Sequence, residues 1–178
     1  LRSIPNLNVF RPCDVIETIE CWEIALKSKN KPSIICLSRQ NLPLIRREKV
    51  LINHSQKGAY IMKDFINKKK VILLATGSEV QIALKAREVL ENQGIGTRVI
   101  SLPSWELFQE QDDKYKKKLL PKGTVRIAIE AGVKLGWEQW LYENGGNQTR
   151  TSFIGMKSFG ASAPAKDIFD HFQINVDE

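Results

Sequence analysis

ILLATGSEVQIALKAR, residues 72–87, decides the fold class of this chain. An apolar run over 71–76 predicts a buried strand, and the helical pattern over 79–92 follows it after a turn of small residues. Ser78 and Gln81 have the spacing of a capping box, so we expect the Ser78 hydroxyl to accept a hydrogen bond from the Gln81 amide at the helix start. A strand joined to a helix in this way is the basic unit of an α/β sheet.

The turn at residues 76–79 is of the strand–glycine–helix kind that often holds a phosphate. It has a single glycine and lacks both the GxGxxG and the GxxxxGK[ST] pattern, whose backbones cradle phosphate groups. Glu79 also adds a negative charge to the first helical turn, where it would repel a phosphate. We therefore interpret the turn as a structural junction, although a stray anion could still reach the helix start.

The same alternation continues through the rest of the chain. Short strands recur and helical segments separate them, which predicts an α/β fold with a doubly wound, mostly parallel sheet and right-handed crossovers. The expected strands cover 97–102, 125–130 and 151–155, and the expected helices cover 105–109, 112–119, 135–144 and 164–172.

The first part of the chain has fewer elements. Asp14 and Glu17 form another capping-box pattern and open a helix, which Lys31–Pro32 ends because a residue before proline avoids the helical region. The continuous apolar run SIICLS, residues 33–38, then predicts a strand that is buried on both faces.

A polar spacer after residue 66 divides the chain into residues 1–66 and 67–178. Just before it, residues 59–65 alternate weakly, as an edge strand does. One helix and two or three strands are too few for a complete domain. We therefore interpret 1–66 as the end of a partial α/β domain whose beginning lies further upstream.

Composition narrows the classes of partner. The chain has 178 residues, of which 42% are hydrophobic, so it can bury a core, and its net charge of +7 suits an anionic partner. The lysine runs 68–70 and 116–118 have no interleaved aromatic residues, and no nucleic-acid signature is present. We interpret both runs as solvated surface and expect phosphorylated small molecules as partners rather than nucleic acid. No apolar stretch approaches the ~18 residues of a membrane helix, so no membrane partner is expected.

The cysteines and histidines give no catalytic or metal-binding pattern. Cys13, Cys21 and Cys36 lack disulfide or metal-site spacing, and we interpret them as reduced thiols, with Cys36 buried in its apolar run. His54 and His171 lie far apart, without a nucleophile elbow or a zinc motif. We expect His171 to pack at a helix end.

Glu130 ends an expected strand, at the edge of a parallel sheet where ligands gather. A carboxylate there can equally cap a helix or pair with a lysine, and we favour that structural role. Trp137 and Trp140 form an aromatic helix face, which we interpret as core or subunit contact rather than a cofactor site.

Arg39 is the strongest candidate for a binding residue. It follows a fully apolar strand and is flanked by the hydroxyl of Ser38 and the amide of Gln40. A guanidinium at the carboxyl end of a sheet presents a planar fork that binds phosphate through two hydrogen bonds. The alternative is a structural arginine satisfied by a carboxylate or by loop carbonyls, and residue types alone slightly favour this alternative.

Several segments together resemble the C-terminal third of the transketolase family. They cover essentially the whole chain in consistent order, and the SRQN segment is more typical of transketolase than of its relatives. The segments are LRSIPNLNVFRPCD (1–14), SRQNLP (38–43), KGAYIMKD (57–64), ATGSEVQIALKA (75–86), VISLPS (99–104), EAG (130–132) and FGASAPAKDIF (159–169).

The resemblance implies a cytoplasmic, homodimeric enzyme that uses thiamine diphosphate and a divalent metal, usually Mg²⁺, to move a two-carbon ketol unit between sugar phosphates. It places the end of the pyrimidine-binding domain in 1–66 and the C-terminal domain in 67–178. In the family, the arginine of the SRQ segment contacts the substrate phosphate, and here that residue is Arg39.

The family's catalytic, cofactor-binding and metal-binding residues belong to segments that would precede residue 1. We therefore expect none of them in this chain and no turnover by the chain alone. Two alternatives remain open. The chain could be a non-catalytic regulatory or partner-binding module that uses the sheet edge near Gly77 and Glu130. It could also be the equivalent part of a deoxyxylulose-phosphate synthase or of an E1 dehydrogenase component.

Overall fold

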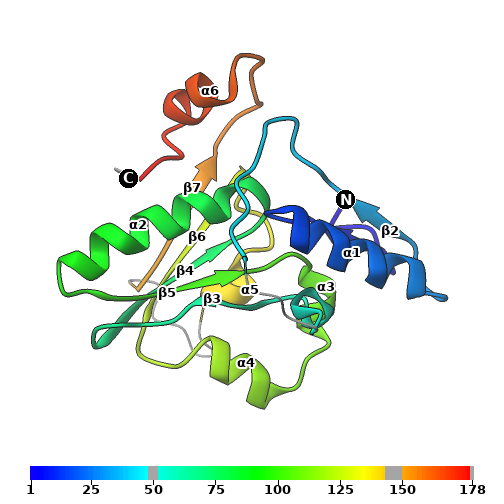
Figure 1. Ribbon diagram of the computed structural model, residues 1–178, viewed down its shortest axis with the longest axis horizontal. Helices are drawn as coiled ribbons and strands as arrows, with labels where there is room; N and C mark the ends of the chain where they lie inside the picture. The colour runs from blue at the N-terminus through cyan, green and yellow to red at the C-terminus, as the bar shows by residue number, and fades with distance from the viewer. Residues whose placement is uncertain (48–51, 143–149, 177–178) are drawn as a thin grey trace.

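The computed structural model describes residues 1–47, 52–142 and 150–176. Within these ranges the strands form two sheets, one of two strands and one of five (Figure 1). The larger sheet has the order β3-β5-β4-β6-β7, and all its neighbouring pairs are parallel except the edge pair β3 and β5. The predicted doubly wound α/β fold is therefore confirmed. The strands are β3 (Tyr60–Lys63), β4 (Lys69–Ala75), β5 (Gly96–Ser101), β6 (Val125–Val133) and β7 (Thr151–Met156).

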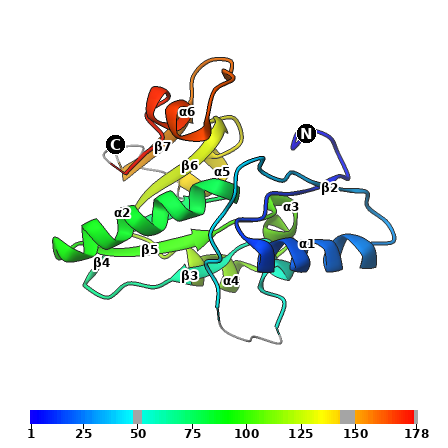
Figure 2. The same ribbon diagram turned by 45° about the horizontal axis from the view of Figure 1, so that its top comes forward.

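Helices cover both faces of this sheet (Figures 1 and 2). One face packs against α2 (Val80–Asn92) and α6 (Ala165–His171), and the other packs against α3 (Trp105–Gln109), α4 (Asp113–Leu119) and α5 (Glu138–Leu141). Alternate strand residues point to opposite faces, so neighbouring apolar residues of β4 serve different layers. The first layer includes Leu73, Ala75, Val80, Ala83, Val99 and Ile129, and the second includes Ile72, Leu74, Ile100, Phe108, Trp137 and Trp140.

The predicted aromatic core is confirmed on the second face. Trp137 is fully buried and Trp140 is 5% exposed, and the ring of Phe108 lies 4.6 Å from that of Trp140. The helix that was predicted to carry both tryptophans is shorter than expected and begins after Trp137. Of the predicted range 135–144, only α5 is helical, and residues 143 and 144 lie outside the described residues.

The start of α2 differs from the prediction. A short 3₁₀ turn, η2 (Gly77–Glu79), comes first, so the residue that caps α2 is Glu79, and no side chain accepts a hydrogen bond at the cap. The Ser78 hydroxyl instead donates to Glu79 Oε1 at 2.5 Å. The expected Ser78 cap is therefore wrong, because the 3₁₀ turn includes Ser78 and a neighbouring carboxylate takes its hydroxyl.

The smaller sheet pairs β1 (Asn8–Phe10) with β2 (Ser33–Ile35) in parallel, and α1 (Val15–Lys27) connects them. As predicted, the Asp14 side chain accepts a hydrogen bond from the Glu17 amide at the start of α1. The strand predicted over 33–38 is wrong in extent and burial. Only β2 forms, and it is half-buried, because β1 is its one neighbour among the described residues.

In the β1–α1–β2 unit, the side chains that are buried differ from those that the sequence suggested, and Cys36, which was expected to be buried, is one of the differences. Cys13 and Cys21 are buried, whereas Cys36 is half-buried, and all three are free thiols. Helix α1 turns its polar side inward and buries Glu17 and Glu20. Its apolar stripe faces out, and that stripe consists of Val15, Ile19, Trp22 and Leu26.

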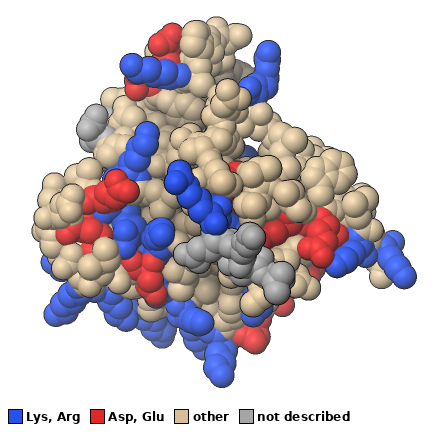
Figure 3. All heavy atoms as spheres, in the orientation of Figure 1, with Lys and Arg blue, Asp and Glu red and all other residues tan. Residues whose placement is uncertain are grey.

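The division into 1–66 and 67–178 stays a prediction, and β3, which precedes that point, is hydrogen-bonded into the five-stranded sheet. Lysines 68–70 are exposed, as are Lys117 and Lys118 of α4. Figure 3 shows Lys and Arg side chains gathered along the lower edge of the molecule, where Figure 1 places α4. Across the described ranges no helix is long and apolar enough to cross a membrane.

Candidate functional site

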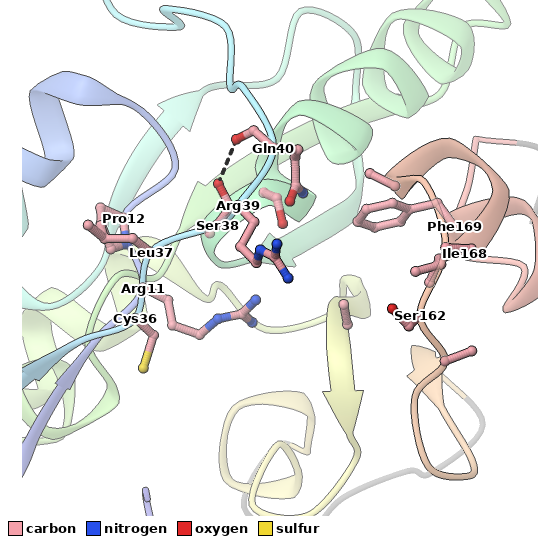
Figure 4. Close-up of a pocket in the computed structure, with 16 residues that line it drawn as sticks. Arg11, Pro12, Cys36, Leu37, Ser38, Arg39, Gln40, Ser162, Ile168 and Phe169 are labelled. Atoms are coloured by element: carbon pink, nitrogen blue, oxygen red, sulfur yellow. Dashed lines mark hydrogen bonds between the residues drawn. The ribbon is translucent and has the colours of Figure 1, made fainter.

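A cavity of about 710 Å³ lies at the carboxyl ends of β4 and β6. Its walls come from the segments that follow β1 and β2, the turn after β4, Ala131 of β6, and α6 with the loop that leads into it (Figure 4). Strand β4 leads through α2 to β5 on one side, whereas β6 lies on its other side. The cavity is therefore at the topological switch point of the sheet, where α/β folds bind ligands.

Arg39 lies on the segment that leaves β2, and it lines this cavity. Its side chain is exposed, and Figure 4 shows its guanidinium directed into the open space, opposite Ser162 and Phe169. In the parts of the chain that the structure describes, Arg39 has no ion pair and no hydrogen bond. The alternative of a structurally satisfied arginine therefore finds no partner there.

Arg11, which follows β1, lines the same cavity but has two carboxylate partners. Its Nη1 lies 2.5 Å from Glu130 Oε1, and its Nη2 lies 3.0 Å from Glu79 Oε2. Burial alone would lower the pKa of Arg11, but the two carboxylates outweigh burial and raise it. Arg11 thus keeps its positive charge, and the two neighbouring carboxylates compensate that charge.

Glu130 is also bonded on its other side. Arg2 Nη1 lies 2.9 Å from Oε1 and 2.8 Å from Oε2, and the Trp137 indole donates to Oε2 at 2.6 Å. Burial would raise the pKa of Glu130, but Arg2 and Arg11 more than offset it, so this pKa lies below its usual value. The predicted structural role of Glu130 is confirmed, with arginines rather than a lysine as partners. We call Arg2, Arg11, Glu79 and Glu130 the charged cluster.

The charges of the charged cluster balance, since two guanidinium groups face two carboxylates. Of the two arginines that line the cavity, Arg11 is therefore compensated and Arg39 is not. The cavity thus presents one uncompensated positive charge and the Ser162 hydroxyl, whereas the Ser38 and Ser78 hydroxyls donate to the Gln40 carbonyl and to Glu79. Such a site suits a small anion with several acceptor oxygens.

A second polar anchor joins the two parts of the chain. Glu17 is fully buried, and its carboxylate accepts hydrogen bonds from the Tyr60 and Ser101 hydroxyls and from the Cys13 amide. Burial raises the pKa of this carboxyl, although the three donors oppose the rise. The sequence indicated Glu17 only as a capping residue.

Sequence reasoning also missed Arg11. The available signal was its position. Arg11 directly follows an apolar strand, Arg39 comes four residues after the end of the parallel neighbour β2, and the ends of parallel neighbours meet at one edge of a sheet. The histidines lie outside the cavity lining, where His54 stacks on Tyr60 and His171 contacts Phe172. No group of three His, Cys, Asp or Glu residues that could hold a metal ion occurs among the residues described.

Together, these features define a doubly wound α/β domain with a cationic cavity at its switch point, closed on one side by part of a second α/β unit. A family model described as "Transketolase-like TK C-terminal domain" matches residues 58–175, and one described as "Transketolase, pyrimidine binding domain" matches 1–45. The chain belongs to the transketolase family, as the resemblance predicted, and corresponds to its C-terminal portion.

Individual relatives agree. A transketolase of Rhodobacter capsulatus is 50% identical over 173 residues, which are 97% of this chain and 26% of that protein. The solved transketolase of Leishmania mexicana is 36% identical, with a TM-score of 0.85 over 99% of this chain and 24% of that one. A Pichia stipitis transketolase in complex with sedoheptulose 7-phosphate has the same identity, TM-score and coverage. The chain therefore spans about a quarter of the length of the relatives it matches.

Proposed function

We propose that this chain is the C-terminal part of an enzyme that transfers a two-carbon ketol unit between sugar phosphates, and that Arg39 binds the substrate phosphate. The observation that carries this proposal is the uncompensated Arg39 guanidinium in the switch-point cavity. A guanidinium fork matches the geometry of a phosphate and forms charge-assisted hydrogen bonds with it. The sugar phosphate bound by the Pichia stipitis relative supports the same class of ligand.

The transketolase family uses thiamine diphosphate. The described residues do not fit its metal, since they contain no suitable cluster of metal ligands, and we assign no catalytic step to this chain. Within this proposal, other segments, like those that make up the rest of the relatives' length, supply the catalytic residues and hold the cofactor and Mg²⁺. The complete enzyme is a homodimer. Three free thiols suit a reducing compartment, which supports a cytoplasmic location.

The alternative of a regulatory module that uses the sheet edge near Gly77 and Glu130 has less support. The Arg11 guanidinium already occupies that edge, and a Cβ at Gly77 would lie 3.3 Å from it. Glu130 has Arg2, Arg11 and Trp137 as partners. The open part of the cavity is instead next to Arg39.

Ligand titration of the 178-residue chain tests the role of Arg39. We expect ribose 5-phosphate and inorganic phosphate to shift the NMR amide signals of Ser38 and Gln40, and unphosphorylated ribose to shift neither. Arg39→Met should weaken phosphate binding about 10- to 100-fold, the contribution of a hydrogen bond between charged groups. Arg47→Met, an exposed arginine on the same segment but outside the cavity lining, is the matched control. Equal binding by wild type and Arg39→Met would overturn the assignment.

A further assay tests the catalytic part of the proposal. With thiamine diphosphate, Mg²⁺, xylulose 5-phosphate and ribose 5-phosphate, the chain alone should show no turnover. Turnover should appear when the chain replaces the matching quarter of the Rhodobacter capsulatus relative. Turnover by the isolated chain, or an inactive but folded chimera, would contradict the proposal.

A further inference from the structure

The side chain of Arg11, which comes from another part of the chain, occupies part of the switch-point crevice between β4 and β6 and forms one wall of the cavity there. In most open α/β sheets this crevice receives a ligand. Here Arg11, which follows β1 of the smaller sheet, contacts Glu79 after β4 and Glu130 of β6, at 3.0 and 2.5 Å. A guanidinium fork can bridge two carboxylates in this way, whereas a lysine would offer a single point charge.

The backbone of Arg11 is held at the same place. Its amide donates to the Pro103 carbonyl, after β5, and its carbonyl accepts from the Gly77 amide, after β4, each at 2.9 Å. Arg11 is thus fixed to the carboxyl ends of three strands of the larger sheet, through its side chain and its main chain together.

Arg11 is directly connected to the segment that carries Arg39. Phe10, the preceding residue, pairs with Ile35 in the parallel register of β1 and β2, and its carbonyl accepts from the Cys36 amide at 2.8 Å. The chain then runs through Leu37 and Ser38 to Arg39, and both guanidinium groups reach the same cavity (Figure 4). A shift of Arg11 would therefore be transmitted to the base of the Arg39 segment.

We infer that Arg11 is a positioning residue and that the C-terminal domain, through Glu79 and Glu130, sets the place from which Arg39 reaches a substrate phosphate. This inference rests on the phosphate-binding role proposed for Arg39. It gives the C-terminal domain a part in substrate recognition, although its two carboxylates are absent from the cavity lining.

The direction in which phosphate affinity changes when a carboxylate is removed distinguishes a positioning role of Arg11 from a purely electrostatic effect. Glu130→Gln and Glu79→Gln each remove a negative charge near the cavity, so Coulomb's law alone predicts tighter phosphate binding. Loss of the Arg11 bridge predicts weaker phosphate binding, because the segments that follow β1 and β2, including the one that carries Arg39, are no longer held in place. A purely structural role in folding predicts a change in stability but none in the affinity of the folded protein.

The experiment measures ribose 5-phosphate and inorganic phosphate affinity of the 178-residue chain by NMR titration. We expect Glu130→Gln, Glu79→Gln and Arg11→Lys each to weaken binding on the order of 3- to 10-fold, part of the contribution of a charged hydrogen bond. Amide signals of β4 and β5 report folding of each variant. Leu119→Ala, a buried change in α4 on the face opposite α2, is the control for lost stability and should bind as wild type does.

The outcomes separate the inference from the proposed function. If Arg39→Met binds phosphate as wild type does, the proposed role of Arg39 fails. If Arg39→Met loses binding while the folded Glu130→Gln and Glu79→Gln variants bind as tightly as wild type or more tightly, the positioning inference alone is overturned. Either glutamate variant is sufficient for this test, so the test can still be made if one of the two variants does not fold.

Discussion

The five-stranded sheet and the contact between its edge and the β1–α1–β2 unit are held together by different interactions. The sheet has two apolar layers, one of which contains Phe108, Trp137 and Trp140. The contact adds Cys13 to one of these layers, but unlike the sheet it also buries charge, in the charged cluster and at Glu17. Apolar burial is non-directional and roughly proportional to area, whereas an ion pair is favourable in one geometry and unfavourable when a partner is missing. The layers thus stabilise the fold, and the contact determines how the two units are aligned.

The largest effect is expected in the apolar layers. Phe108→Ala removes a fully buried ring that packs against Trp140, and it should lower the free energy of unfolding by about 3–5 kcal/mol. Chemical denaturation measures this loss. Phosphate affinity of the fraction that remains folded should not change, and a large loss of affinity would contradict the division of roles.

A smaller effect is expected at the contact. Arg11→Met leaves Glu79 and Glu130 without that cation, and because the arginine is partly exposed we expect a loss of about 2–3 kcal/mol, below the full value for a buried pair. Lys27→Met, which breaks an exposed pair with Glu23, is the matched control and should change stability by less than about 0.5 kcal/mol. Similar losses of stability in both variants would show that the ion pairs of Arg11 contribute no more than an exposed surface ion pair.

The pH dependence of stability distinguishes the two buried carboxylates of the contact. Glu130 has a lowered pKa, so its stabilisation is present above its ordinary value of 4.5 and is lost as the pH falls through its folded pKa. Glu17 has a raised pKa, so folding is less favourable when it ionises, and the protein gains stability as the pH falls from its folded pKa toward 4.5. Unfolding curves of wild type, Glu130→Gln and Glu17→Gln from pH 7 to 3 should show the first effect below about pH 4.5 and the second above it. An unchanged pH profile in both variants would refute these assignments.

The smallest effects concern the two capping-box patterns. Asp14→Ala removes a true cap and should lower stability by about 1 kcal/mol or somewhat more, since Asp14 also accepts from the amides of Ile45 and Arg46. Ser78→Ala removes no cap, but it takes one hydrogen bond from the buried Glu79 carboxylate and should lower stability by about 1 kcal/mol. Thermal unfolding of each variant, alone and combined with Glu79→Gln, separates the two roles. The loss at Ser78 should shrink when Glu79 is replaced and the loss at Asp14 should not, so an undiminished loss at Ser78 would restore Ser78 as a cap.

The two patterns also show how far local sequence signals reach. Both have the spacing of a capping box, and the one at Asp14 forms as expected. At Ser78 the carboxylate of Glu79 is drawn toward Arg11, a residue that precedes it by 68 positions, and the local pattern contains no trace of that partner. The short, half-buried strand β2 also differs from the prediction because of distant parts of the chain. Its burial depends on neighbouring strands rather than on its own apolar residues.

The sequence by itself determined the alternating strands and helices, the parallel sheet, the apolar layers and the choice of Arg39 as a candidate. These features follow from periodicity, turn residues and the position of a side chain at a strand end, which are all properties of short stretches. Only the tertiary structure decided that Arg11 is neutralised while Arg39 is not, and that Glu130 and Glu17 join the two units. These pairings connect residues 43 to 128 positions apart, and their strength depends on distance and burial, which the order of residues does not specify.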